Sequence, residues 1–177
     1  MALSRKMNCG YLAGFFVLIV LWMFWGCGYK FAGSGTYPAG VKRIFISILE
    51  NRTTETGIEK VFTDDMVNEF IRRDETGLAN DKDDADAVLI GVIDSMSVET
   101  ITHTGVYTSD TRRVTISVNL KLVGGKKRIL WSGVITDNEA YDVADDKFAT
   151  DEKRRDAITV ISKRMAEKFY NRLTADF

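Results

Sequence analysis

The chain has 177 residues, enough for one domain with its own core and too few for two domains of ordinary size. Its 24 Lys and Arg residues nearly balance 25 Asp and Glu residues, and the net charge is -1. This balance argues against nucleic acid as a partner. There are one His and two Cys, and both Cys lie within the first 27 residues, so the rest of the chain lacks the usual ligands of a metal site.

The first 26 residues predict a signal peptide. Arg5 and Lys6 form a positive start, and the apolar stretch YLAGFFVLIVLWMFW follows. Its 15 residues fall short of the about 20 that a membrane-spanning helix needs. A positive start before a short apolar stretch is typical of a secretory signal, and we therefore exclude this segment from the fold.

Cys27 follows that apolar stretch directly and has three alternative roles. It could attach a lipid, form a disulfide with Cys9, or end a membrane-spanning helix that Cys9 and its neighbours extend. The disulfide is disfavoured because Cys9 would leave with the signal peptide. The spanning helix is disfavoured by its length.

Residues 27–41 predict a short tether, rich in Gly and containing the only proline, Pro38. About a dozen residues separate Cys27 from the first expected strand, and at roughly 3.3 Å per residue they reach about 40 Å. A domain on such a tether works close to its membrane. We expect this single domain to occupy residues 42–177.

The first half of the domain predicts a strand, a helix and a second strand. The stretch KRIFISILENRT, from Lys42, has apolar residues on both sides and predicts a strand buried on most of both faces. Residues 57–73 have apolar residues at helical spacing and basic residues in the last turn, and Gly77 follows as a stop. Residues 85–101 begin as a continuous apolar run and then alternate, which predicts a strand that emerges into solvent. The apolar residues of the helix are Ile58, Val61, Phe62, Met66, Val67, Phe70 and Ile71.

The second half predicts a hairpin and a long helix. The stretch RRVTISVNLKLV alternates apolar and polar residues without a break, which is typical of a strand with one buried face. Gly124 and Gly125 then predict a two-residue turn, with a basic cluster just past it. Residues 151–173 predict an amphipathic helix that Thr150 or Asp151 caps. Its apolar stripe is Ala157, Ile158, Ile161, Met165, Phe169 and Leu173.

This order, β-α-β-β-β-α, predicts an α+β fold. We expect a four-stranded mixed sheet with two helices packed on one face, because each helix has one apolar side and the strands are polar on one side. The opposite face of the sheet is left open. It would carry Arg113, Thr115, Ser117, Asn119 and Lys121.

No motif for catalysis or for a cofactor is present. The chain lacks G-x-S-x-G, H-E-x-x-H and a P-loop, and His103 lies alone in a polar loop. The acidic loop at 80–86 lacks the Gly and Glu that an EF-hand requires at set positions. We therefore expect no enzyme activity, no cofactor and no metal site.

The basic cluster Lys126, Lys127 and Arg128 has two interpretations. It is an ordinary charged turn, or it is a cationic tip that contacts phosphate or carboxylate groups of an anionic ligand.

Four features together resemble the lipopolysaccharide-assembly lipoprotein family, LptE. They are GCGYKF at Cys27, the stretch PAGVKRIFISILENRT, the strand DADAVLIGVI, and the amphipathic C-terminal helix. The resemblance runs from Cys27 to the C-terminus. It implies a sheet with two helices on one face and a lipidated Cys27 anchored at the outer membrane. It also implies a protein that plugs the lumen of the β-barrel translocon LptD, helps the barrel assemble and binds lipopolysaccharide during its export.

Two positions bear on what the resemblance implies for function. The cationic cluster Lys126, Lys127 and Arg128 lies where a contact with lipopolysaccharide is expected. Before Cys27, the usual lipoprotein cleavage box has Leu and then a small residue, whereas this chain has Phe24 and Trp25, and only Gly26 fits.

Two alternatives remain open. The first is an outer-membrane lipoprotein that activates a cell-wall synthase, whose strands contain runs similar to ADAVLIG. Such proteins commonly carry a long Pro-rich stalk after the cysteine, and this chain has only the short tether. The second is an uncleaved, membrane-anchored enzyme, which the missing catalytic motifs disfavour.

Overall fold

The computed structural model describes residues 37–101 and 110–175. The regular elements are η1 (Pro38–Gly40), β1 (Ile44–Ile46), β2 (Glu50–Asn51), α2 (Ile58–Asp74), η2 (Glu75–Gly77), β3 (Ala87–Ile101), β4 (Thr111–Gly124), η3 (Gly125–Lys127), β5 (Ile129–Asp142) and α3 (Lys147–Ala175).

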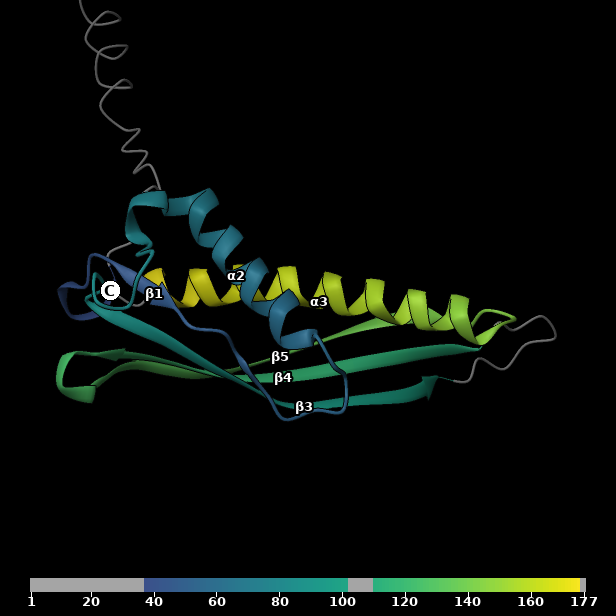
Figure 1. The fold of residues 1–177 in the computed structure, drawn as a ribbon. Helices are drawn as coiled ribbons and strands as arrows, with labels where there is room; N and C mark the ends of the chain where they lie inside the picture. The colour runs from purple at the N-terminus through teal and green to yellow at the C-terminus, as the bar shows by residue number, and fades with distance from the viewer. Residues whose placement is uncertain (1–36, 102–109, 176–177) are drawn as a thin grey trace, which may run out of the picture. The chain divides into compact units, whose positions relative to one another are not determined.

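The strands form one mixed sheet in the order β1-β3-β4-β5, and β2 also pairs with β3. β1 and β2 run parallel to β3, whereas β3, β4 and β5 are antiparallel neighbours. Both helices lie on the same face of the sheet, and the other face is uncovered (Figure 1). The predicted α+β fold with two helices on one face is therefore confirmed.

The core fills the space between the sheet and the two helices. The inward residues of β4 are completely buried, as their alternation predicts, and so is most of the stripe of α3. Together these residues form one continuous hydrophobic cluster that also contains the first described residue, Tyr37. The inward residues of β4 are Val114, Ile116, Val118, Leu120 and Leu122.

The sheet has five strands, and the prediction of four was wrong in this count. The expected first strand is interrupted, since Ile46 pairs with Leu89 whereas Glu50 pairs with Val92. Four residues of the first segment therefore span three residues of β3. The extra residue breaks the ladder into the short strands β1 and β2.

The interruption also reverses which side chains face the core. Ile48, predicted to lie on the same side as Ile44 and Ile46, is 76% exposed, whereas Leu49 is buried. Leu49 lies over Gly91, where an added Cβ would be 2.7 Å from Leu49 Cγ. A glycine is required at this point of β3 because the bulge turns a leucine onto it.

The helix boundaries differ from the prediction at the start of α3. This helix begins at Lys147 instead of residue 151, because Asp146 caps it: the Ala149 N–H donates to Asp146 Oδ1 at 2.9 Å. In α2, Ile71 is 46% exposed although it was predicted in the apolar stripe. Two residues earlier in α2, Glu69 is buried instead, and its carboxylate forms ion pairs with Arg72 and Arg73.

Candidate ligand-binding site at the hairpin end of the sheet

The hairpin tip, defined as Lys126, Lys127 and Arg128, joins β4 to β5. Lys126 and Lys127 both have φ of 58°, in the left-handed region, and the Arg128 N–H donates to Gly125 O at 3.4 Å. This is a turn of the primed type, with lysine at both central positions where Asn and Gly are favoured. The two lysines therefore form the turn itself instead of following it.

The predicted Gly124-Gly125 turn was wrong because Gly124 belongs to the ladder. Gly124 has φ of -91°, and its N–H donates to Arg128 O at 2.9 Å. The side chain of Leu130 covers it, since an added Cβ would lie 2.8 Å from Leu130 Cδ1. Packing against Leu130 explains this glycine better than a turn does.

Exchanging the two lysines for the residues that such a turn prefers should stabilise the protein. A left-handed conformation costs a non-glycine residue about 1–2 kcal/mol, and Asn and Gly reduce this cost. We expect Lys126→Asn with Lys127→Gly to raise the free energy of unfolding by about 1 kcal/mol or more, measured by urea denaturation. A lower stability would show that the lysine side chains support the fold.

A hollow of about 450 Å³ lies between the hairpin and the start of the fold. Its lining includes Lys126 and Arg128 of the hairpin tip, and Asp86, the residue before β3. The Lys42 and Arg43 N–H groups donate to Asp86 Oδ2 at 2.9 and 3.0 Å and lower the pKa of Asp86. The remaining lining residues are Ala39, Gly40, Val41, Gly124, Gly125 and Leu130.

The cations of the hairpin tip have no carboxylate partner in the described part of the chain. All three side chains are exposed, and every ion pair found among the described residues involves other groups. Three neighbouring unpaired cations beside a hollow are suited to an anionic group.

The open face of the sheet is apolar in the half next to the hairpin tip. Ile90, Ile129 and Val134 are 45%, 56% and 53% exposed. Lys121 lies among them, paired with Ile90 on one side and with Ser132 on the other. The apolar half of the open face comprises Phe45, Val88, Ile90, Val92, Val123, Ile129 and Val134. Sequence analysis missed this patch because its residues come from four strands, and only the register brings them together.

The other half of the open face is polar. Arg113, Thr115 and Ser117 lie in this half. Of the five predicted open-face residues, Arg113 here and Lys121 in the apolar half are exposed, whereas Thr115, Ser117 and Asn119 are half-buried. Thr136 Oγ1, for example, donates to Ser117 Oγ at 3.2 Å.

Tyr37 fixes the start of the fold beside the hairpin. Its hydroxyl donates to Asp74 Oδ2 at 2.9 Å, and its ring stacks on Phe70 with centroids 6.2 Å apart. Burial and the bond to Asp74 raise the pKa of Tyr37, so the hydroxyl stays a donor. Ala39, Gly40 and Val41, which follow Tyr37 closely, line the hollow together with the hairpin, so the start of the domain lies next to the hairpin tip.

An ion-pair network joins β5 to α3. Asp137 faces inward and is buried, and its Oδ2 lies 3.0 Å from both Arg164 Nε and Lys168 Nζ. Arg164 also contacts Glu139 at 2.6 Å and donates to Asn138 O at 2.6 Å. A signal for this network existed in the sequence, since Asp137 and Glu139 occupy the positions of β5 that alternate inward.

Two residues that the sequence analysis singled out lie outside the described ranges. They are Cys27, the predicted lipid attachment point, and His103. Within those ranges, no helix combines the length and the apolar character needed to cross a bilayer, and no three His, Cys, Asp or Glu side chains converge as metal ligands.

The fold resembles solved lipoprotein structures at low identity. Lipoprotein B from Nitrosomonas europaea is 12% identical, with a TM-score of 0.56, and the match covers 84% of this chain and 92% of that one. Rare lipoprotein B from Shewanella oneidensis is 13% identical, with a TM-score of 0.46, and covers 75% and 95%. A minor lipoprotein from Acinetobacter baumannii is 11% identical, with a TM-score of 0.45, and covers 77% and 93%. The first of these supports the fold.

No curated protein matches the chain. The family model of LptE, described as lipopolysaccharide-assembly, matches residues 41–173, which is most of the chain and almost all of the described fold. The chain therefore belongs to the lipopolysaccharide-assembly family LptE.

Proposed function

We propose that this chain is an outer-membrane lipoprotein, anchored through an acylated Cys27, that plugs the lumen of the β-barrel LptD. It assists the assembly of that barrel and binds lipopolysaccharide during transport to the cell surface. Membership of the LptE family supports the role in lipopolysaccharide assembly. The acyl anchor, the barrel partner and the binding of lipopolysaccharide go beyond family membership and are our proposal.

The observation that carries ligand binding is the use of lysine at both left-handed positions of the hairpin tip. Each lysine has an unfavourable backbone conformation that Asn or Gly would relieve, and each extends an unpaired cation into solvent. Strain of this kind is common at functional sites. The two lysines thus add positive charge at the hairpin tip and lower the stability of the turn.

The chemistry around the tip matches an anionic amphiphile. Lipopolysaccharide carries phosphate groups next to acyl chains. Lys126 and Arg128 line the hollow and suit the phosphates, as a point charge and as a two-pronged donor. The exposed apolar side chains of Ile90, Ile129 and Val134 suit the acyl chains beside them.

The last strand of the sheet is suited to insertion into a barrel. β5 is an edge strand, and two of its carbonyl oxygens are already occupied: Arg164 donates to Asn138 O and Arg172 donates to Val134 O, the latter at 3.0 Å. Capped edges resist pairing with other strands. Such a domain can lie inside a β-barrel without joining its wall.

A triple variant tests ligand binding. We expect Lys126→Ser, Lys127→Ser and Arg128→Ser together to weaken lipopolysaccharide binding at least about tenfold, because charge-assisted hydrogen bonds to phosphate are lost. The melting temperature should stay the same, since serine keeps the left-handed cost. Binding is measured with purified lipopolysaccharide by isothermal titration calorimetry.

The matched control moves the same change to the other end of the sheet. Lys147, Lys153 and Arg155 are not part of the hairpin end and lie in the first turns of α3. Their replacement with serine should leave binding unchanged. Equal lipopolysaccharide binding by wild type and the hairpin variant would show that the tip is an ordinary charged turn.

A further inference from the structure

The second half of β3 has a neighbouring strand on one side only. In its first half, β1 pairs with residues 87–89 and β2 with residues 92–93, while β4 pairs with both halves on the other side. Residues 95–101 follow a register shift and continue the strand beside β4, but no described strand lies on their other side. Figure 1 shows this end of β3 at the margin of the sheet. We call the unpaired side of residues 95–101 the free edge.

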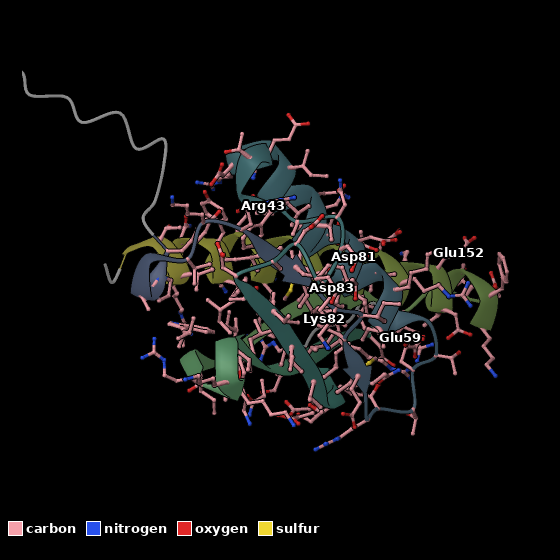
Figure 2. The ribbon with its side chains drawn as sticks, turned by 60° about the vertical axis from the view of Figure 1, so that its left-hand side comes forward. Arg43, Glu59, Asp81, Lys82, Asp83 and Glu152 are labelled. Carbon is pink, nitrogen blue, oxygen red and sulfur yellow. The ribbon has the colours of Figure 1, made fainter. Side chains whose placement is uncertain are left out.

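The chain turns away from β3 just before the free edge. The last backbone hydrogen bond from this segment to β3 runs from the Arg52 N–H to Ile93 O, at 3.1 Å. The Asn51 amide then donates to Glu55 O at 2.7 Å and to Glu59 Oε2 at 3.0 Å, which directs the chain into α2. Figure 2 shows Glu59 at the start of that helix, beside the loop that follows β2. No hydrogen bond from another described segment reaches the free edge.

The two edges of the sheet differ in their protection. On β5, Arg172 and Arg164 of α3 donate to two backbone oxygens, as described above. On the free edge, no described side chain bonds to the backbone. Residues 95–101, SMSVETI, also lack the proline and the lysine that commonly protect an edge strand. The free edge is therefore suited to accept another strand.

An incompletely covered part of the core adjoins the free edge. Met96 and Val98 pair with Ile116 and Val114 of β4, which are both completely buried, so all four residues lie on the helix-covered side of the sheet. Met96 is partly buried and packs against the core, whereas Val98 is 42% exposed. An apolar side chain on a strand added at this edge would cover Val98.

The chemistry of the free edge specifies a polypeptide as its ligand. Backbone N–H and C=O groups on the unpaired side match those of an extended segment, whereas an acyl chain offers neither donors nor acceptors. The open side of the edge carries Ser97 and Glu99, and Glu99 lies across from Arg113 of β4. A segment with an apolar residue toward Val98 and polar residues on the opposite side fits both faces.

The length of the free edge favours a segment of a partner that already surrounds the domain over a second copy of this chain. Seven residues extend about 23 Å. One strand pair of this length is far smaller than the about 1,200–2,000 Å² that a specific interface buries, so it does not hold two copies together. A partner that is already bound presents its segment at a high effective concentration, and a short strand pair then suffices.

From these observations we propose that the free edge binds an extended segment of the barrel partner by strand addition. Every wall strand of a closed barrel already has two neighbours, so the segment comes from a part of the barrel chain outside the wall. It pairs with residues 95–101 and covers Val98. The inference rests on the barrel partner of the proposed function and names the part of the domain that bonds to it.

Amide hydrogen exchange followed by mass spectrometry tests the strand pair. The full lipidated chain is compared alone in detergent and in its purified complex with the barrel. In the chain alone, about half of the amides of residues 95–101 point away from β4 and should exchange fast. We expect their exchange to slow by at least about tenfold in the complex. The outward amides of β5 are the internal reference and should exchange at the same rate in both samples.

A charge on the core side of the free edge should prevent the pairing. Val98→Lys places a cation where the added strand would cover an apolar side chain, and inward-pointing charges of this kind block edge strands. We expect exchange of residues 95–101 in the complex to return to the rate of the chain alone. The melting temperature of the chain should stay the same, because Val98 is partly exposed. Val160→Lys on α3 is the matched control, since Val160 is also 42% exposed, and it should keep the protection.

The contrary results are distinct. A purified complex in which residues 95–101 exchange as fast as in the chain alone overturns the strand pair and leaves the proposed function intact. Equal slowing at both edges, or protection that persists in Val98→Lys, also overturns it. Protection in the chain alone that rises with its concentration would identify a second copy as the occupant and contradict the inference. Failure to isolate a complex with the barrel contradicts the proposed function, and the inference with it.

Discussion

Replacing Phe70 with alanine is expected to lower the free energy of unfolding by about 3–5 kcal/mol, because it removes a completely buried ring and leaves a cavity. The ring of Phe70 lies 6.2 Å from that of Tyr37, 6.0 Å from that of Phe169 and 5.1 Å from that of Tyr170. It therefore connects the start of the fold to α3. Urea denaturation followed by circular dichroism measures the loss.

The next residue provides the matched control for Phe70. Ile71→Ala removes an apolar side chain from the same helix turn, but Ile71 is 46% exposed, so we expect a loss of less than about 1 kcal/mol. Similar losses for the two variants would mean that the aromatic cluster does not form. A loosened cluster should also release Tyr37, since the ring of Phe70 supports it.

Replacing Asp137 with asparagine is expected to cost about 2–3 kcal/mol at neutral pH, because Arg164 and Lys168 lose their shared carboxylate. Both cations are partly exposed, so solvent screening keeps the cost below that of a fully buried ion pair. Thermal or urea denaturation at pH 7 measures the cost. Asp145→Asn, in an exposed loop position, is the control and should change little.

The effect of Asp137 should depend on pH. Burial alone raises the pKa of Asp137, but hydrogen bonds from Lys168, from the Asn138 N–H and from Arg164 outweigh it and hold that pKa below 3.8. Because the pKa is lower in the folded state, the stabilisation is complete above the unfolded-state pKa and is lost as the pH falls through the folded-state pKa. Wild type and Asp137→Asn should thus converge in stability in acid. A constant difference down to low pH would contradict the charge-based account.

The fold was largely predictable because its long elements repeat their pattern many times. Twelve residues of alternation identified β4, and a stripe over six turns identified α3. The break between β1 and β2 was not predictable in the same way. A single extra residue creates it, and Ile48 and Leu49 are equally apolar, so hydrophobicity does not indicate which of them faces the core.

The candidate site was predictable only in its charges. Lys126, Lys127 and Arg128 are adjacent in the sequence and were identified there. The turn was misplaced because two glycines usually mark a hairpin turn, whereas here Gly124 stays in the ladder and packs against Leu130. The hollow and the apolar half of the open face were not predictable, since their residues come from segments that only the sheet topology brings together.

The account as a whole is tested most directly by isolating the partner of the tagged full-length protein from outer membranes solubilised in mild detergent. We expect a large β-barrel, LptD, to co-purify in about a one-to-one ratio and to remain bound at high salt, because a plug buries an extensive surface inside the barrel. Recovery of a cell-wall synthase without the barrel, or of the protein alone, would contradict the proposed function.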